Sequence, residues 1–455
     1  MRLTWVQPED LLLHSFVQAR AEGADVEHLE RRWVEAGGSR QVPVGGAADL
    51  PAPPALRSLA AELLDAVDEL APPHHLELAP VLARIDGAGT SAAPGSAGHH
   101  DDLADRIHGA WLGRAAGCLL GKPVEKIARA GIEEILRSTD RWPLDDWFTA
   151  AGLPPEVAAR WPWNRRSAVT SLAENIDGMP EDDDLNFAVL ALRLLEQHGS
   201  ALSTEHVAQA WLDNLPAGRV FTAERVAYRN LLEGTDPERA ALVRNPFREW
   251  IGALIRADVH GWAHPGDIRS AVASAWVDAR LSHTGAGAEG ALWAAALASA
   301  ALVAPTVDAA LEAASVVLEP GSPLDVAVGR GTELGRTTAS DDAGLDALHA
   351  EFGHLHWVHV LNNAATIAFA LSRGGGDFGR SIALAVTAGW DTDSVGATVG
   401  GVVGGVLGAR TLPDRWVKPL DNRLATSLPG PAELAIDELA TATSALAARG
   451  PRSGR

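Results

Sequence analysis

Two segments of this chain carry a glycine at every fourth position, and this spacing restricts the fold more than any other feature. The glycines are Gly109, Gly113, Gly117 and Gly121 in the first segment and Gly396, Gly400, Gly404 and Gly408 in the second. Residues four apart lie on one face of an α-helix, yet a glycine inside a helix costs about 1 kcal/mol relative to alanine. Close approach of another backbone would offset this cost. The spacing therefore predicts two buried helices, each with a glycine face, in one tightly packed core.

Acidic residues stand at the start of the second glycine-rich segment. Asp391, Asp393 and Ser394 precede a run that carries no charge until Arg410. Aspartate and serine are common helix caps, and aspartate also favours the positive end of the helix dipole. Capping requires only one such residue, whereas three oxygen-bearing side chains converge here. Because hard divalent cations prefer carboxylate and hydroxyl oxygens, the sequence favours a metal site over capping alone.

A second acidic cluster precedes another apolar segment. Four consecutive acids, Glu181 to Asp184, lead into residues 187–195, which are apolar apart from Arg193. A helix that is apolar on most sides is buried, and like charges in such surroundings raise one another's pKa or require a cation. Alone, this cluster fits either a capped surface turn or a site. Together with Asp391 and Asp393 it predicts two helix starts that jointly hold one or two divalent ions.

Two further residues are candidates for contact with a ligand. Pro123 ends the first glycine-faced helix, so Glu125 stands just beyond a buried helix, although a lone glutamate there is usually a surface residue. His283 lies in a glycine-bearing loop, where it either contacts a ligand or has a structural role. Three other histidines lack a zinc-binding frame, and we expect packing or capping roles for His354, His356 and His359.

Helical patterns separated by proline- and glycine-bearing breaks run along the whole chain, and no segment alternates as a strand does. The predicted fold class is therefore all-α, with expected helices that include residues 8–21, 26–36, 55–70, 247–258 and 432–448. We expect a helical N-terminal extension at 1–85, a linker rich in Gly, Ala and Ser at 86–102, and the main domain at 103–448. The extension contains no site-like motif, so a chain starting near Asp101 is expected to fold and bind metal.

Composition excludes several classes of protein. A net charge of −21 argues against general binding to nucleic acid or membranes, which favours a basic face. The single cysteine, Cys118, rules out an internal disulfide, and neither a signal peptide nor a transmembrane segment is recognisable. We therefore expect a cytoplasmic protein, and the many alanines, glycines and arginines suggest a GC-rich bacterial genome. An acidic protein that handles a phosphorylated substrate needs local cations, which bound metal would supply.

Residues 103 to about 440 resemble the ADP-ribosylglycohydrolase family, the all-helical hydrolases that include the dinitrogenase reductase-activating glycohydrolase. The family commonly has Thr-Asp-Asp-Thr at its second motif and Gly-Asp-Thr-Asp-Thr at its third. Three blocks carry the resemblance, in the family's order: the first glycine-faced helix with Lys122-Pro123-Val124-Glu125, then Glu181-Asp182-Asp183-Asp184, then Trp390-Asp391-Thr392-Asp393-Ser394. The resemblance implies a compact multi-helix domain of ADP-ribosylglycohydrolase type, with the N-terminal extension outside the match.

The resemblance also implies a set of site residues. Two magnesium or manganese ions would be held by Asp182, Asp183, Asp184, Asp391, Asp393 and Ser394. An alignment shifted by one residue would admit Glu181 in place of Asp184. Catalysis is expected from Glu125, near the scissile bond, and from Asp183. Substrate binding is expected from Gly121, Lys122, His283, Gly285 and Gly287.

Three functions remain open at this point. The first is a metal-dependent hydrolase that cleaves the glycosidic bond between ADP-ribose and a modified protein side chain. The second is the same chemistry on a small N-riboside or nucleotide metabolite. The third is a non-catalytic relative that binds ADP-ribose, which a loss of the ligand acids would favour. The sequence leaves the leaving group, the choice between magnesium and manganese, and the oligomeric state undecided.

Overall fold

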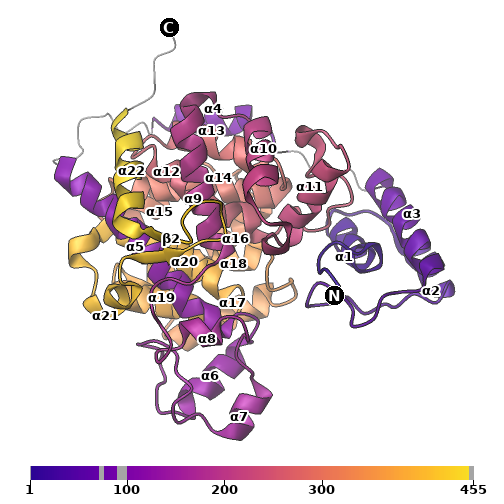
Figure 1. Cartoon of the computed structure of the whole chain (residues 1–455), viewed down its shortest axis with the longest axis horizontal. Helices are drawn as coiled ribbons and strands as arrows, with labels where there is room; N and C mark the ends of the chain where they lie inside the picture. Colours follow the sequence, from indigo (N-terminus) through magenta and orange to yellow (C-terminus); the bar gives the residue numbers. More distant parts are fainter. Residues whose placement is uncertain (1, 71–75, 90–99, 450–455) are drawn as a thin grey trace.

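The computed structural model describes residues 2–70, 76–89 and 100–449, and they form an all-α protein, as the sequence predicts. Figure 1 shows a large helical body, with α1, α2 and α3 standing at one side of it. The helices up to the second acidic cluster are α1 (Pro8–Ala21), α2 (Glu27–Glu35), α3 (Pro54–Leu70), α4 (Leu78–Ala88), α5 (His100–Gly121), α6 (Arg129–Arg137), α7 (Pro155–Arg160), α8 (Ala168–Ser171) and α9 (Asp183–His198).

The helices of the middle part surround an alanine-rich segment. They are α10 (Thr204–Asn214), α11 (Thr222–Leu232), α12 (Asp258–Trp262), α13 (Ile268–Ala279), α14 (Gly285–Ala301), α15 (Val307–Ser315), α16 (Pro323–Thr337) and α17 (Asp341–Phe352). All residues of α14 are buried. A helix that is apolar nearly all round must lie inside the protein, and its alanines and glycines let neighbouring helices approach closely.

The C-terminal part contains the second glycine-rich segment and a small sheet. Its helices are α18 (Val360–Gly374), α19 (Phe378–Thr387), α20 (Thr392–Leu407), α21 (Asp414–Val417) and α22 (Ile436–Arg449), and its strands are β1 (Arg423–Ala425) and β2 (Glu433–Ala435). Short 3₁₀ helices complete the fold: η1 (Lys122–Val124), η2 (Gly199–Ala201), η3 (Ala217–Arg219), η4 (Pro237–Arg239), η5 (Ile251–Arg256), η6 (Ala409–Thr411) and η7 (Lys418–Leu420).

The two glycine-faced helices, α5 and α20, pack directly against each other, so the predicted close-packed core is confirmed. They run antiparallel, since Gly113 faces Gly400 while Gly121 faces Thr392. A methyl group at Gly113 would overlap the carbonyl oxygen of Gly400, and one at Gly400 would overlap that of Gly113. The close contact brings the end of α5 to the start of α20, where the hydroxyl of Thr392 donates to the Gly121 carbonyl at 2.8 Å.

Two of the expected elements differ in the structure. β1 and β2 pair antiparallel, so residues 433–435 are a strand and the helix expected over 432–448 begins only at Ile436. These three-residue strands are too short to show an alternating pattern. The helix expected over 247–258 is wrong as well, because this segment contains η5 followed by the start of α12. The Ile251 amide donates to the carbonyl of Val358 at 3.0 Å, a contact between distant segments that replaces a helical hydrogen bond.

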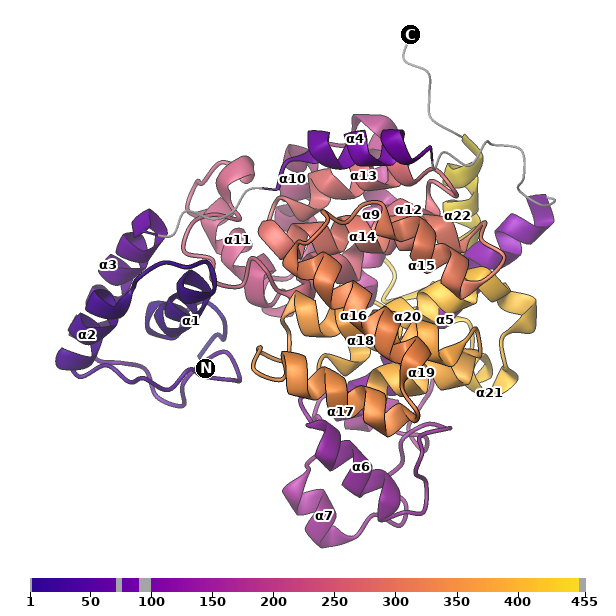
Figure 2. The same cartoon turned by 180° about the vertical axis from the view of Figure 1, so that it is seen from behind.

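The N-terminal helices occupy two places. Figures 1 and 2 show α1, α2 and α3 grouped at one side of the body, whereas α4 lies on the body beside α13. Arg84 of α4 donates to the carbonyl of Val317 at 2.8 Å, so this helix belongs to the main body although its sequence falls within the expected extension. The expected linker, 86–102, is shorter than predicted, because its first three residues end α4 and its last three begin α5. Its residues 90–99 lie outside the described part of the chain.

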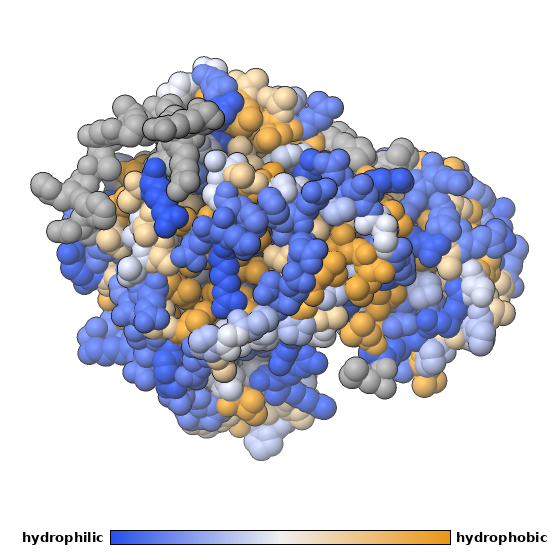
Figure 3. Space-filling model, turned by 45° about the horizontal axis from the view of Figure 1, so that its top comes forward, coloured by the Kyte–Doolittle hydropathy of each residue, from blue (hydrophilic) through white to orange (hydrophobic). Residues whose placement is uncertain are grey.

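The face shown in Figure 3 is mainly hydrophilic, with apolar residues gathered in separate patches. This agrees with the acidic composition of the chain. In the part of the chain that the structure describes, each helix is too short or too polar to span a lipid bilayer.

Candidate active site

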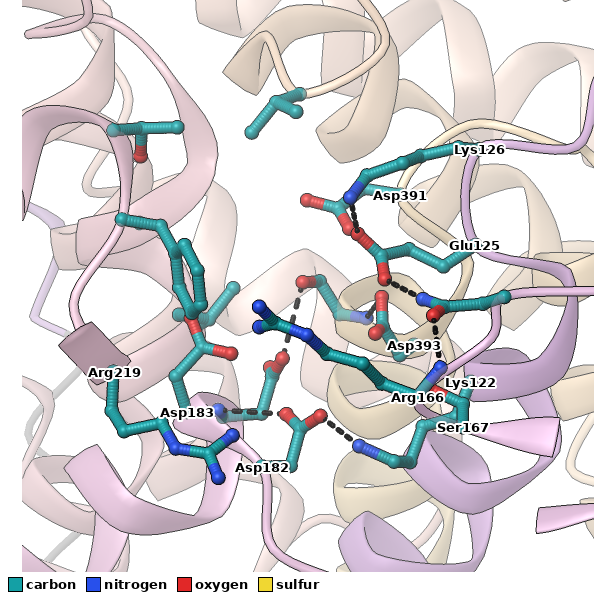
Figure 4. Close-up of a pocket in the computed structure, with 18 of the residues that line it drawn as sticks. Lys122, Glu125, Lys126, Arg166, Ser167, Asp182, Asp183, Arg219, Asp391 and Asp393 are labelled. Carbon is teal, nitrogen blue, oxygen red and sulfur yellow. Dashed lines mark hydrogen bonds and ion pairs between the residues drawn. The ribbon is translucent and has the colours of Figure 1, made fainter. Parts of the chain in front are cut away.

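The starts of α9 and α20 meet at one cavity of about 890 Å³, a volume within the range of small-molecule sites. Figure 4 shows the acidic residues on facing sides of it. The predicted site residues that line the cavity are Lys122, Glu125, Asp182, Asp183, Asp184, Asp391, Asp393 and Ser394. Glu181 lines it too. The two acid-bearing helix starts, which are far apart in the sequence, therefore lie at one cavity in the structure.

The first turn of α20 presents one group of oxygen atoms to the cavity. Asp391 occupies the N-cap position, yet within the described residues its carboxylate makes no capping hydrogen bond. The backbone amide of Asp391 is held instead by the side-chain oxygen of Asn363, at 3.3 Å. Capping therefore does not account for the Asp391 carboxylate. It stays available for a ligand, as does the hydroxyl-bearing Ser394 one turn further on.

The start of α9 presents the other group. Asp182 caps this helix by accepting from the Asp184 amide at 2.9 Å, and its second oxygen forms an ion pair with Lys122. Glu181 points differently, because its carboxylate accepts from Asn186 at 2.8 Å and pairs with Arg219 at 3.0 Å. Glu181 thus already has cationic and amide partners.

A direct hydrogen bond joins the two helix starts. The Ser394 hydroxyl donates to Oδ2 of Asp184 at 3.2 Å, while Oδ1 of Asp184 has no hydrogen-bond partner among the described residues. Beneath Asp184 lies the fully buried Arg114, 3.5 Å from Oδ1, whose other contacts include Asp258 at 2.5 Å. Arg114 thus offsets part of the negative charge of Asp184 and Asp258 from inside α5.

The electrostatics of these carboxylates follow from burial and mutual repulsion. Burial, followed by the charges of neighbouring acids, raises the pKa well above the ordinary aspartate value at Asp183, Asp184 and Asp391. Burial and then the charge of Glu125 raise the pKa of Asp393 to about 7. At Asp182 burial also acts upward, but the ammonium group of Lys122 outweighs it and lowers the pKa.

This donor set fits divalent cations. Several buried carboxylates that repel one another, together with a hydroxyl and an oxygen of Asp184 that accepts no hydrogen bond from the described residues, offer the oxygen ligands that magnesium and manganese prefer. The Sγ of Cys118 and one oxygen each of Asp182 and Asp184 lie within 4.8 Å of one another. Cys118 is a soft ligand, and burial raises the pKa of its thiol well above the ordinary value, so the oxygen atoms are the better match for a hard ion.

Glu125 stands at the cavity just beyond η1, as the sequence predicts. Its carboxylate accepts from the Asn164 side chain at 2.6 Å and pairs with Lys126 at 3.2 Å. Its side chain is 19% exposed, so it lies at the cavity wall rather than on open surface. Asn164 and Lys126 hold the carboxylate beside the acids of the cavity (Figure 4). A glutamate on the open surface would need no such partners.

Of the five residues expected to contact substrate, the structure places one at the cavity and four elsewhere among the described residues. Lys122 lines the cavity, whereas Gly121 serves the packing of α5, since a methyl group there would overlap the backbone of Thr392. His283, Gly285 and Gly287 are not among the described residues that line the cavity. His283 is buried against Ser282, 2.8 Å away, and the two glycines pack on Arg248 and Glu249. The structure therefore places these three away from the cavity: His283 lies just before α14, and both glycines lie in its first turn, inside the body. His359, by contrast, caps α18, as expected.

Sequence reasoning missed several residues that line the cavity. They are Thr4, Trp5, Gly45, Lys126, Asn164, Arg165, Arg166, Ser167, Thr170, Pro180, Gly218, Arg219, Phe221, Thr222, Glu224, Ile251, Gly252, Ile255, Trp357 and Val358. Most lie in loops, where no periodicity marks them. Arg114 beneath the site could have been found, because it is the one charged residue between Gly109 and Gly121.

Comparison with known proteins gives a family match. Residues 99–450 match the model of the family described as ADP-ribosylglycohydrolase. Among solved structures, a chain described as "ADP-ribosylglycohydrolase-related protein complex" is similar at 22% identity and a TM-score of 0.47, covering 76% of this chain and 99% of that one. A comparison with curated proteins gives no match.

Proposed function

Because the chain belongs to the ADP-ribosylglycohydrolase family, we propose that it hydrolyses the glycosidic bond between ADP-ribose and a modified group, with two magnesium or manganese ions. The observation that carries this proposal is the meeting of two acid-bearing helix starts with Glu125 at one cavity. Asp182, Asp183, Asp184, Asp391, Asp393 and Ser394 would hold the ions. Bound there, the ions would supply positive charge for ribose hydroxyls and an activated water.

The residues of the chain supply the remaining steps. Glu125, oriented by Asn164 and Lys126, is placed to exchange a proton with the attacking water or the leaving group, the general acid–base role of glycosidase carboxylates. The water oxygen bonds to the anomeric carbon as the bond to the leaving group breaks. The negative field of the acids stabilises the oxocarbenium-like transition state.

Positive residues on the cavity wall support a phosphorylated substrate. Lys126, Arg166 and Arg219 line the cavity, and Figure 4 shows them around the acids. In a protein of net charge −21, these side chains offer the local cations that a diphosphate needs. Their arrangement favours ADP-ribose over an uncharged riboside.

The test is a substrate panel with defined metal. The protein is treated with chelator and then assayed with added Mg²⁺ or Mn²⁺ on peptides ADP-ribosylated at arginine or serine, and on small ribosides. We expect release of free ADP-ribose that depends on metal. Hydrolysis of ribosides alone would move the function to a small metabolite. If the protein binds ADP-ribose but releases none with either metal, the catalytic proposal is wrong and the protein is a binding relative.

A further inference from the structure

The N-terminal helices contribute to the same cavity although they stand outside the glycine-faced core. Thr4, Trp5 and Gly45 line the cavity together with the acids of α9 and α20. We propose that helices α1 to α3, with the loops that carry these three residues, form a fixed wall of the active site that selects substrates by size. This inference rests on the proposed function, because it assigns a role within that site.

The wall is fixed to the body by partly buried polar contacts. Arg225 of α11 donates to the carbonyl and the hydroxyl of Thr4, both at 2.8 Å. Arg248 donates to both carboxylate oxygens of Glu22 at 2.7 and 2.6 Å, and its side chain is only 6% exposed. Both bonds come from the single nitrogen Nη2 of Arg248, and hydrogen bonds between charged groups are stronger than those between neutral groups. The N-terminal helices are thus attached to the segments that line the cavity.

Trp5 packs into an aromatic cluster of the body. Its ring meets those of Phe247 and Trp250 edge to face, with centroid distances of 5.4 and 5.6 Å. Its backbone has φ = +62°, held by a 2.7 Å hydrogen bond from its amide to the carbonyl of Gly46. A non-glycine residue in this region costs of order 1–3 kcal/mol and persists where its surroundings enforce it.

The strained backbone positions gather at this cavity. Of the seven described non-glycine residues with positive φ, three line it: Trp5, Lys126 and Thr222. Such positions are frequent at ligand-binding sites, where they fix side chains that must not move. Two independent observations therefore connect Trp5 to ligand binding: its strained backbone and its position in the cavity wall.

The chemistry of the wall determines what it can do. Thr4, Trp5 and Gly45 carry no ionisable group and no metal-binding carboxylate. They can therefore contact or exclude a substrate but cannot transfer its proton or hold its metal. Changes in this wall should alter substrate affinity and leave the chemical step intact.

Gly45 gives a sharp test, because it is exposed on the cavity wall and an added Cβ meets no described atom within 4 Å. Its φ also lies outside the left-handed region. The series Gly45→Ala, Gly45→Leu and Gly45→Trp should fill the cavity by increasing amounts without disturbing the fold. The matched control is Gly329→Leu in α16, which is likewise exposed with no described atom within 4 Å of an added Cβ.

Binding of ADP-ribose by calorimetry and turnover of the best substrate of the wild-type panel are measured for each variant. We expect KM and Kd to rise with side-chain size, by about tenfold or more for Gly45→Trp, with kcat within about twofold and the control unchanged. If the wild type is active but KM and Kd stay unchanged across the series, the proposed wall is wrong and the proposed function still stands. A wild type that neither binds nor hydrolyses overturns both, and a fall in kcat alone also contradicts the wall.

Discussion

At the scale of single residues, the site is an accumulation of buried negative charge. Asp391 and Asp183 both have pKa values raised by burial and by neighbouring acids. Such a cluster is unfavourable on its own and becomes favourable when a cation binds. The same carboxylates therefore lower the stability of the metal-free protein and supply its affinity for metal ions.

This balance makes a two-sided prediction for Asp391→Asn, and equally for Asp183→Asn. Without metal, the variant should unfold at the same temperature as the wild type or higher, because one repelling charge is gone. The rise in melting temperature on adding Mn²⁺ should be lost, together with hydrolysis. Calorimetric melting with and without Mn²⁺ measures both effects. Asp414→Asn, at a side chain that is 73% exposed, is the control that should change neither. Full activity in both site variants would contradict the metal assignment.

Glu125 should behave differently, because we assign it to proton transfer and not to metal. Glu125→Gln should still bind Mn²⁺ and ADP-ribose with near-normal affinity, yet turn over at least about a hundredfold more slowly. Calorimetric titration and steady-state rates separate the two effects. Glu133→Gln on α6 is the matched control, since its carboxylate pairs with Arg137 of the same helix and does not line the cavity described above. Unchanged turnover would reject the catalytic role, and lost metal binding would make Glu125 a ligand.

At the scale of elements, the contact between α5 and α20 positions the site. A methyl group at Gly113 or Gly400 would overlap a backbone oxygen of the facing helix. Backbone atoms cannot move aside as a flexible side chain can, so the helices would have to separate. That separation would also displace the start of α20, which carries Asp391 and Asp393.

We therefore expect Gly113→Ala to destabilise the protein by about 1–3 kcal/mol, the usual cost of overpacking, despite the better helix propensity of alanine. Gly329→Ala in α16 is the control in open surroundings and should stabilise by up to about 1 kcal/mol. Urea unfolding of both variants measures the opposite signs. A stabilising Gly113→Ala would mean that the two helices are not in close contact.

The sequence predicted these elements where a regular pattern reported burial. Glycine spacing identified α5 and α20, and the acids before residues 187–195 and after Gly389 identified both halves of the site. The pattern failed where distant contacts decide the backbone, as at η5, whose Ile251 amide bonds to Val358. The substrate contacts expected at Gly285 and Gly287 are a similar case: these glycines pack closely on Arg248 and Glu249, and close packing gives the same sequence pattern as ligand contact.

At the scale of the whole molecule, the N-terminal helices change the expected domain organisation. A chain starting near Asp101 would lose Trp5 from the aromatic cluster and leave Arg248 buried without Glu22. Loss of one partner of a buried ion pair is strongly destabilising. The sequence could not show this, because a docking surface has no periodicity of its own. We still propose that such a chain folds and binds metal, but we expect it to be less stable than the full chain.

The docked helices should also make stability depend on pH. Burial raises the pKa of Asp68 to about 6, although it accepts from the Arg244 amide of the body. A carboxyl group with a raised folded pKa stabilises below its unfolded pKa, near 4, and loses this contribution as pH rises through 6. Asp68→Asn should therefore raise the free energy of unfolding at pH 8 by at most about 3 kcal/mol, and the melting temperature with it. Below pH 4 the substitution should change little. Melting curves across this range test it, with Glu69→Gln at an exposed position of α3 as control, and a gain that is independent of pH would contradict it.

The pairing of α5 with α20 has a consequence for biosynthesis. The Thr392 hydroxyl bonds to the Gly121 carbonyl across 271 residues. At a translation rate of about 5–20 residues per second, the ribosome needs roughly 15–55 seconds to add that stretch. Throughout this interval, the glycine face of a nascent α5 has no partner, and its backbone is open to wrong contacts. Chaperone capture of stalled nascent chains should therefore be strongest before α20 emerges and fall sharply once it does.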